Sequence, residues 1–281
     1  MLLEGKNAVI YGGGGAIGGA VARAFAREGA RVFLAGRTLA SLEAVAADIR
    51  DAGGTADTAE VDALDERAVD AHADALASRA GSIDICMNVI SHGDVQGTPF
   101  VEMALEDYLR PVDTAVRTTF LTSRAAGRHM VRQGSGVILA FGGSGDPPRD
   151  YYLGGLQVAF EAIEAMRRQL SSELGRHGVR FVTLRTGGVP ETIPPGVEGM
   201  EAVVADIERQ TMLGRRPGWR TPATWPPSWP RTGPHHDRGH RQPQLRGPER
   251  LRDSCLQAAS GRAIWEVRSL PLAVVAASRL G

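Results

Sequence analysis

The chain of 281 residues contains one lysine, Lys6, and two cysteines, Cys86 and Cys255. Because Lys6 lies so early, no tyrosine has a lysine four residues after it, which excludes every Tyr-x-x-x-Lys pair. Two cysteines give no particular support to a disulfide, so we expect a protein of the reduced cytoplasm. No run of about 18 apolar residues exists, which excludes a membrane-spanning helix, and Met1–Lys6 is too short and polar for a signal peptide. The formal net charge of zero argues against a general binder of nucleic acid or of membrane surfaces.

Short apolar runs alternate with alanine-rich helical patterns over residues 1–213. The apolar runs predict strands near 8–11, 31–35, 56–61, 83–88, 137–141 and 180–184. The helical patterns predict helices near 17–28, 39–52, 66–79, 105–132 and 155–175. Strands that alternate with helices indicate a parallel sheet covered on both faces. We therefore predict an α/β fold with a Rossmann-like, doubly wound parallel sheet in a single domain over residues 1–213.

Four glycines, residues 12–15, separate the first predicted strand from the first predicted helix. Such a turn lets backbone N–H groups approach a pyrophosphate, and the start of the following helix favours its negative charge. Glycine suits the turn because a Cβ would block that approach or a positive φ. The turn predicts a dinucleotide site, and a merely flexible loop is the alternative.

Four segments resemble motifs of the short-chain dehydrogenase/reductase family: residues 11–18 (YGGGGAIG), 61–63 (VDA), 84–91 (DICMNVIS) and 186–192 (TGGVPET). The resemblance extends over residues 4–213 and implies a nicotinamide dinucleotide cofactor. The residues that it implies in cofactor binding are Gly12, Gly15, Ile17, Gly18, Asp62, Asn88, Thr186, Gly187 and Thr192. The segments depart from the family pattern at Tyr11, Ala16, Val89 and Thr186.

The second predicted strand is followed by Arg37, with no acidic residue there to hold the ribose hydroxyl of NAD. A guanidinium suits the 2′-phosphate of NADP. We therefore predict NADP in preference to NAD, with a solvated surface arginine as the alternative interpretation of Arg37.

In the resembling family a tyrosine transfers the proton, a lysine lowers its pKa and holds the ribose, a serine polarises the carbonyl, and an asparagine supports a proton-relay water. Alignment on the Glu-Leu-Gly at 173–175 places them at Leu156, Phe160, Gly143 and Ala115, none of which can transfer a proton. Neighbouring residues that could substitute are Ser144, Tyr151 and Tyr152. Neither tyrosine has a lysine partner, and an unassisted phenol with a pKa near 10 is a poor acid–base group at neutral pH. These three residues are therefore weak candidates, with ordinary loop residues as the alternative.

His92 and Asp94 follow the fourth predicted strand, where a substrate pocket would open. A solvated histidine is the alternative interpretation there. The sequence has no spacing typical of metal ligands, so we expect no metal site.

The composition changes near residue 214. Half of the sixteen prolines lie between Pro217 and Pro248, and all four tryptophans follow the change. If residues 224–234 are read in a shifted frame, the genetic code permits VAAFLASDRA, which resembles the family's last helix. A further shift lets residues 234–248 encode RTMTAATVNLSCGA, which resembles its last strand. We therefore expect residues 214–281 to be an irregular, frameshifted tail, with a genuine Pro/Arg-rich extension as the alternative.

These features predict an NAD(P)(H)-binding oxidoreductase that acts on a carbonyl/alcohol pair with non-standard or weak catalysis. We expect a small-molecule substrate and a homo-oligomer, and no nucleic-acid or membrane partner. Two alternatives remain open: a catalytically inactive dinucleotide-binding pseudoenzyme or redox-sensing partner protein, and a fragment that cannot fold because its last strand is missing.

Overall fold

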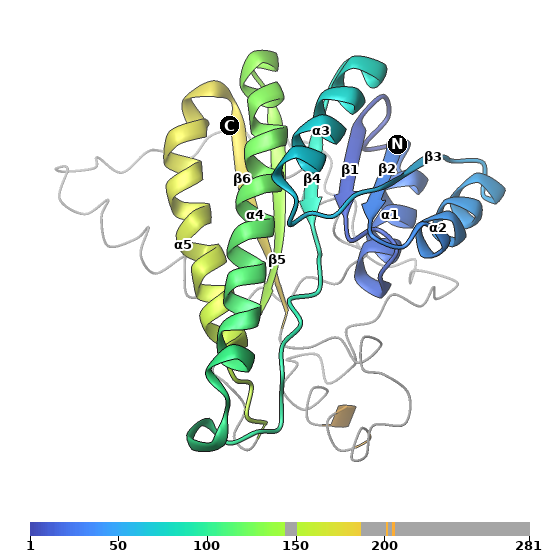
Figure 1. The fold of residues 1–281 in the computed structure, drawn as a ribbon. Coiled ribbons are helices and arrows are strands. Elements are labelled where there is room, and N and C mark those ends of the chain that lie inside the picture. Colours follow the sequence, from blue (N-terminus) through green and yellow to red (C-terminus); the bar gives the residue numbers. More distant parts are fainter. Residues whose placement is uncertain (144–150, 187–200, 202–203, 206–281) are drawn as a thin grey trace, which may run out of the picture. The chain divides into compact units, whose positions relative to one another are not determined.

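The computed structural model describes residues 1–143, 151–186, 201 and 204–205. Its strands are β1 (Asn7–Tyr11), β2 (Arg31–Gly36), β3 (Thr55–Glu60), β4 (Ile85–Asn88), β5 (Gly136–Gly143) and β6 (Val179–Thr186). Its α-helices are α1 (Ala16–Arg27), α2 (Leu39–Asp51), α3 (Glu66–Ala80), α4 (Leu105–Gln133) and α5 (Leu156–Leu174). Two short 3-10 helices are η1 (Phe100–Glu102) and η2 (Gly175–His177). Every strand and helix predicted in this part of the chain is present (Figure 1).

The strands form one parallel sheet in the order β3-β2-β1-β4-β5-β6 (Figure 1). This order reverses direction between β1 and β4, as expected for a doubly wound sheet. The predicted Rossmann-like α/β fold is therefore confirmed. The carboxyl ends of β1 and β4 flank the reversal, where ligands bind in such sheets.

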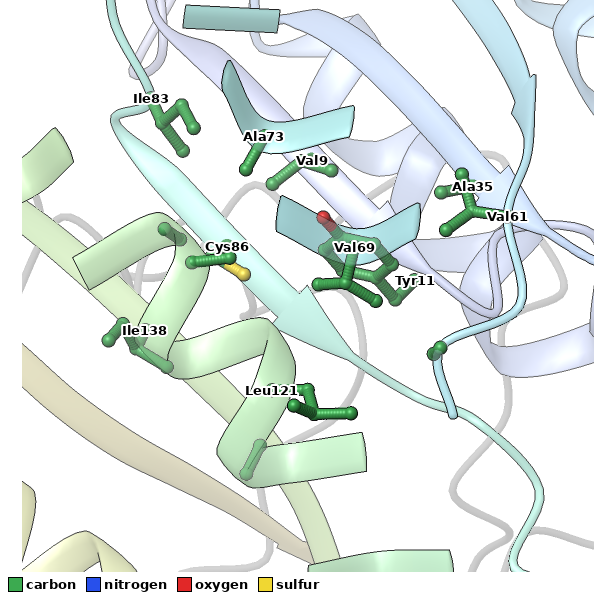
Figure 2. Packing of buried hydrophobic residues seen from close by; sticks show 14 of the residues in the cluster. Val9, Tyr11, Ala35, Val61, Val69, Ala73, Ile83, Cys86, Leu121 and Ile138 are labelled. Atoms are coloured by element: carbon green, nitrogen blue, oxygen red, sulfur yellow. The ribbon is translucent and has the colours of Figure 1, made fainter. Parts of the chain in front are cut away.

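Helices cover both faces of the sheet, which explains why the inner strands β1, β2, β4 and β5 are almost continuously apolar. Alternate residues of β1 belong to different clusters: Ala8 and Ile10 pack with α1 and α2, whereas Val9 and Tyr11 pack with α3, α4 and α5. Figure 2 shows the second of these clusters, with Cys86 of β4 beside Tyr11. The two clusters hold the carboxyl ends of the strands in fixed positions.

Local sequence signals set several helix ends. The carboxylate of Asp65 caps α3 by accepting hydrogen bonds from the backbone N–H groups of Arg67 (2.9 Å) and Ala68 (3.1 Å). The same helix ends at Gly81, and α4 ends at Gly134; both glycines have left-handed backbones. The predicted boundary at 213/214 and the tail lie outside the described residues. No helix in the described part of the chain meets the length and apolarity needed to cross a membrane.

Candidate cofactor and active site

The glycine turn is held against β2 and against the loop after β4. The N–H groups of Gly12 and Gly13 donate to the carbonyl of Ala35, at 2.8 and 3.2 Å. Gly12 has φ +85°, and a Cβ there would lie 2.7 Å from the carbonyl oxygen of Val89. A Cβ on Gly18 would collide with the carbonyl of Gly12. Two of the glycines are therefore needed for the turn's own packing, in addition to the approach of a ligand.

The start of α1 is open to a ligand. Gly15 is the residue before the helix, it is exposed, and no side chain caps the helix there. The first N–H groups of a helix have no partner within the helix, so they are donors for an anion. A Cβ on Gly15 would meet only the carbonyl of Gly12, at 3.4 Å. The turn and the uncapped helix start together fit the pyrophosphate of a dinucleotide.

Arg37 lies at the carboxyl end of β2 and is exposed. It forms no hydrogen bond or ion pair with another described residue. Gly36, immediately before it, is the register partner of Glu60 at the end of β3. One cation that has no partner among the described residues, Arg37, and one acid, Glu60, therefore lie at the edge where the ribose of a bound dinucleotide would be expected. The sequence pattern indicated only Arg37.

Asp62 and Asn88 have different surroundings. Asp62 is exposed, and one carboxylate oxygen accepts a hydrogen bond from the N–H of Leu64 (3.0 Å). Asn88 is buried: its amide nitrogen donates to the hydroxyl of Thr118 (3.1 Å), and its amide oxygen accepts from the N–H of Ile90 (3.1 Å). The side chain of Asn88 thus fixes the turn after β4, whose Val89 carbonyl lies against Gly12.

The remaining predicted cofactor residues divide into two groups. Ile17 is half-buried and packs against the cluster beneath α1, and Thr186 ends β6 at the carboxyl edge of the sheet. Gly187 and Thr192 lie outside the described residues.

Two of the positions that the family resemblance marks as catalytic are in contact. A Cβ on Gly143, the serine position, would lie 2.6 Å from the ring of Phe160, the lysine position. Leu156 begins α5, and Ala115 is completely buried within α4. The structure therefore brings an aromatic ring against a glycine where the resemblance implies a hydroxyl and an ammonium group.

The substitute candidates are Ser144, Tyr151 and Tyr152. Ser144 lies outside the described residues. The carbonyls of Tyr151 and Tyr152 accept hydrogen bonds from the N–H of Gly97, at 3.4 and 3.1 Å, so the segment before α5 is tied to the loop after β4. Tyr152 is 46% exposed and has φ +46°, an unusual backbone conformation for a residue other than glycine.

His92, in the loop after β4, is a half-buried titratable group. Its ring centroid lies 6.0 Å from that of Phe160, with the planes at 66°, an edge-to-face contact. Burial lowers the pKa of His92, and nearby Asp94 acts in the opposite direction. A largely neutral imidazole therefore lies against the aromatic ring that occupies the lysine position.

Other titratable groups near the sheet are enclosed in the core. Burial raises the pKa of Cys86 to about 12, and its thiol lies 3.7 Å from the carbonyl oxygen of Thr122. Tyr11 and His72 share a hydrogen bond of 3.1 Å between the hydroxyl and Nδ1. Among the described residues, no group of three or more His, Cys, Asp or Glu side chains could hold a metal ion.

Comparisons with known proteins agree with this geometry. A family model described as enoyl-(acyl carrier protein) reductase matches residues 14–220. A sorbitol dehydrogenase of Cereibacter sphaeroides is 33% identical over 215 residues, which are 74% of this chain and 78% of that protein. A D-threitol dehydrogenase of Mycolicibacterium smegmatis is 31% identical over 65% of this chain and 69% of its own length. The crystal structure of a metagenomic short-chain oxidoreductase in complex with NADP is 26% identical, with a TM-score of 0.61, over 67% of this chain and 85% of that one. The chain belongs to the short-chain dehydrogenase/reductase family.

Proposed function

We propose that this protein is an NADP(H)-dependent oxidoreductase of a small alcohol/carbonyl pair, and that its catalysis is non-standard and slow. The observation that carries the proposal is the glycine turn opening onto the exposed, uncapped start of α1. Nicotinamide supplies hydride chemistry when the cofactor is bound. The turn and helix start would hold its pyrophosphate, and Asp62 would hold its adenine.

NADP is favoured over NAD because Arg37 is exposed and makes no ion pair with a described residue. The solved neighbours do not decide between them, because one is a complex with NADP and another a complex with NAD+. Glu60, next to Gly36 in the sheet, opposes the choice of NADP, since a carboxylate repels a phosphate. We expect the cation to dominate because Glu60 belongs to the neighbouring strand, whereas Arg37 directly follows β2.

Two of the relatives bear the names of polyol dehydrogenases, which supports a substrate of that class. We therefore expect a small polyol or a similar secondary alcohol. Slow catalysis follows from the replacement of the proton-transfer groups, at Leu156, Phe160, Gly143 and Ala115. Turnover should be far below the common range of about 1–1,000 per second.

Calorimetry with NADP and NAD, followed by turnover with a panel of polyols and carbonyls, tests this function. Tight NADP binding with slow turnover supports the proposal. Tight binding with no turnover favours the second candidate, a dinucleotide-binding pseudoenzyme, for which the Phe160–Gly143 contact is the specific observation. Failure to bind either dinucleotide would contradict both.

Two further expectations belong to this proposal. Apolar side chains are exposed along α4 and α5, at Leu109, Phe120 and Val158, and we expect a second copy of the chain to cover them in a homo-oligomer. Light scattering on the purified protein measures the mass that decides this. We also expect the protein to work in the cytoplasm, where NADPH is the usual reductant and Cys86 stays reduced.

A further inference from the structure

Three elements meet around one aromatic ring at the carboxyl edge of the sheet. Phe160 projects from the second turn of α5, against the end of β5 at Gly143 and against His92 from the loop after β4. This loop leaves β4 beside the reversal in strand order, where doubly wound sheets bind their ligands. The imidazole of His92 thus lies against the lysine position that the family resemblance marks, one helical turn from the tyrosine position at Leu156.

Among the described charged groups near Phe160 and His92, only Asp94 acts on the pKa of His92. Asp94, on the same loop, acts on His92, and one oxygen of its carboxylate accepts a hydrogen bond from the side-chain amide of Gln96 (2.6 Å).

The neighbouring elements bring charges that are already paired. The side chain of Arg110, on α4, packs beside Gly93 and forms an ion pair with Asp107 at 2.6 Å. Glu161 of α5 lies 3.8 Å from Arg185 of β6. Desolvation against Phe160 is therefore the main influence on His92, and it favours the neutral imidazole.

We propose that His92 is the acid–base residue of this site and takes the proton of the substrate hydroxyl during alcohol oxidation. This assignment rests on the proposed NADP-dependent function. A neutral imidazole is a proton acceptor, so the site is suited to oxidation of an alcohol more than to protonation of a carbonyl. The tyrosine candidates compare poorly, because Tyr152 is 46% exposed in a strained backbone and no tyrosine in the sequence has a lysine four residues after it.

The reaction balances as follows. The substrate loses the hydrogen of its O–H bond as a proton, which His92 accepts to become imidazolium. It loses the hydrogen of its carbinol C–H bond as a hydride, for which NADP⁺ is the acceptor. The electron pair of the O–H bond forms the second bond of the carbonyl, so the alcohol is oxidised by two electrons. The proton leaves His92 to solvent before the next turnover.

The test compares His92→Gln and His92→Ala with the wild type and with His177→Gln, a histidine of η2 at the opposite edge of the sheet. Both His92 variants should lower kcat for alcohol oxidation by about 100-fold or more, the scale of a lost general base. Their NADP dissociation constants, measured by calorimetry, should stay within about twofold of the wild type because His92 acts on the substrate. Free imidazole should restore part of the activity of His92→Ala and none of that of His92→Gln.

A readout that does not depend on turnover follows the imidazole itself. The Cε1–H proton NMR signal of His92, identified by its loss in His92→Gln, should titrate below about pH 6.5 and shift when a polyol is added to the NADP-bound protein. The wild-type kcat/KM for oxidation should fall at acidic pH with the same pKa, and this limb should be absent from His92→Gln. Unchanged kcat in both variants, failure of imidazole rescue, or an NADP-binding wild type that oxidises no alcohol would overturn the assignment. Failure of the wild type to bind NADP would instead sink the proposed function.

Discussion

The ring of Phe160 occupies the space beside Gly143, so closely that a Cβ built on the glycine would lie 2.6 Å from it. The side chains that can be placed at these two positions therefore depend on each other. A serine at Gly143 needs a smaller or more flexible residue at Phe160, and a lysine at Phe160 would be placed beside a glycine with no hydroxyl. Neither substitution alone recreates the arrangement that the family resemblance implies.

A double-mutant cycle measures this coupling. Gly143→Ser should destabilise the fold by about 1–3 kcal/mol because the added side chain overpacks the site. In a Phe160→Ala background the same change should cost at least about 1 kcal/mol less, which urea unfolding would detect. Gly175→Ser is a matched control, since a Cβ there meets nothing within 4 Å. Equal costs in both backgrounds would mean that the two residues do not compete for space.

Arg37 and Glu60, at the carboxyl ends of β2 and β3, give a second test. Arg37→Ala should weaken NADP binding by about 1–3 kcal/mol, the scale of a charge-assisted contact, and leave NAD binding nearly unchanged. Glu60→Gln, at the register partner of Gly36, should instead strengthen NADP binding because it removes a nearby negative charge. Calorimetry measures the affinities of the wild type and of both variants for NADP and for NAD. An equal loss for NADP and NAD in Arg37→Ala would contradict a role in phosphate recognition.

The glycine turn is better tested at Gly15 than at Gly12. Gly12→Val would impose a branched side chain on a positive φ and against Val89, so loss of binding could reflect a damaged fold. Gly15 is exposed with φ −79°, where any residue is tolerated. Gly15→Asp should abolish dinucleotide binding because its carboxylate would lie where the pyrophosphate binds. Gly15→Ala is the control and should leave the melting temperature and most of the affinity intact; unaltered binding by Gly15→Asp would place the cofactor elsewhere.

Most strands could be predicted because a parallel sheet covered on both faces leaves an apolar run in its inner strands, whereas the edge strand β3, TADTAE, has no such run and was predicted from the alternation of strands and helices. The end of β5 was less visible: it was predicted at residue 141 and lies at Gly143, since the last residues are held by pairing with β6 and carry no side-chain signal. The surroundings of the site residues could not be predicted. Asn88 meets Thr118, and His92 meets Phe160, across separations in the chain that no local pattern records.

The tail gives a test at the level of the gene. Residues 214–281 lie outside the described part of the chain, so the frameshift remains a prediction. β6 pairs on one side with β5 and has no neighbour on its other side among the described residues. Restoring the alternate frame over residues 224–248 should add a helix and a strand at this edge and raise the melting temperature. Resequencing the gene, limited proteolysis and calorimetric melting of both versions would check it; equal stability would indicate that the tail is a genuine extension.

The hydrogen-bonded pair of buried Tyr11 and half-buried His72 predicts a dependence of stability on pH. Burial, with a smaller contribution from the charge of Arg79, lowers the pKa of His72 to about 4. Because this value lies below about 6.5, the value in an unfolded chain, the unfolded state takes up the proton first as the pH falls. The free energy of unfolding should therefore be unaffected by His72 above about pH 6.5 and decline between about pH 6.5 and 4.

At pH 5 the loss attributable to His72 should be about 2 kcal/mol relative to pH 8. Urea unfolding of the wild type and of His72→Gln across this range isolates it, since the variant keeps the titration of the carboxylates but not that of the imidazole. Tyr11→Phe removes the 3.1 Å hydrogen bond and keeps the burial, so it should retain the pH dependence if desolvation is the main cause. A wild type and a His72→Gln variant that lose stability in parallel between pH 8 and pH 5 would show that the imidazole is already solvated in the folded protein.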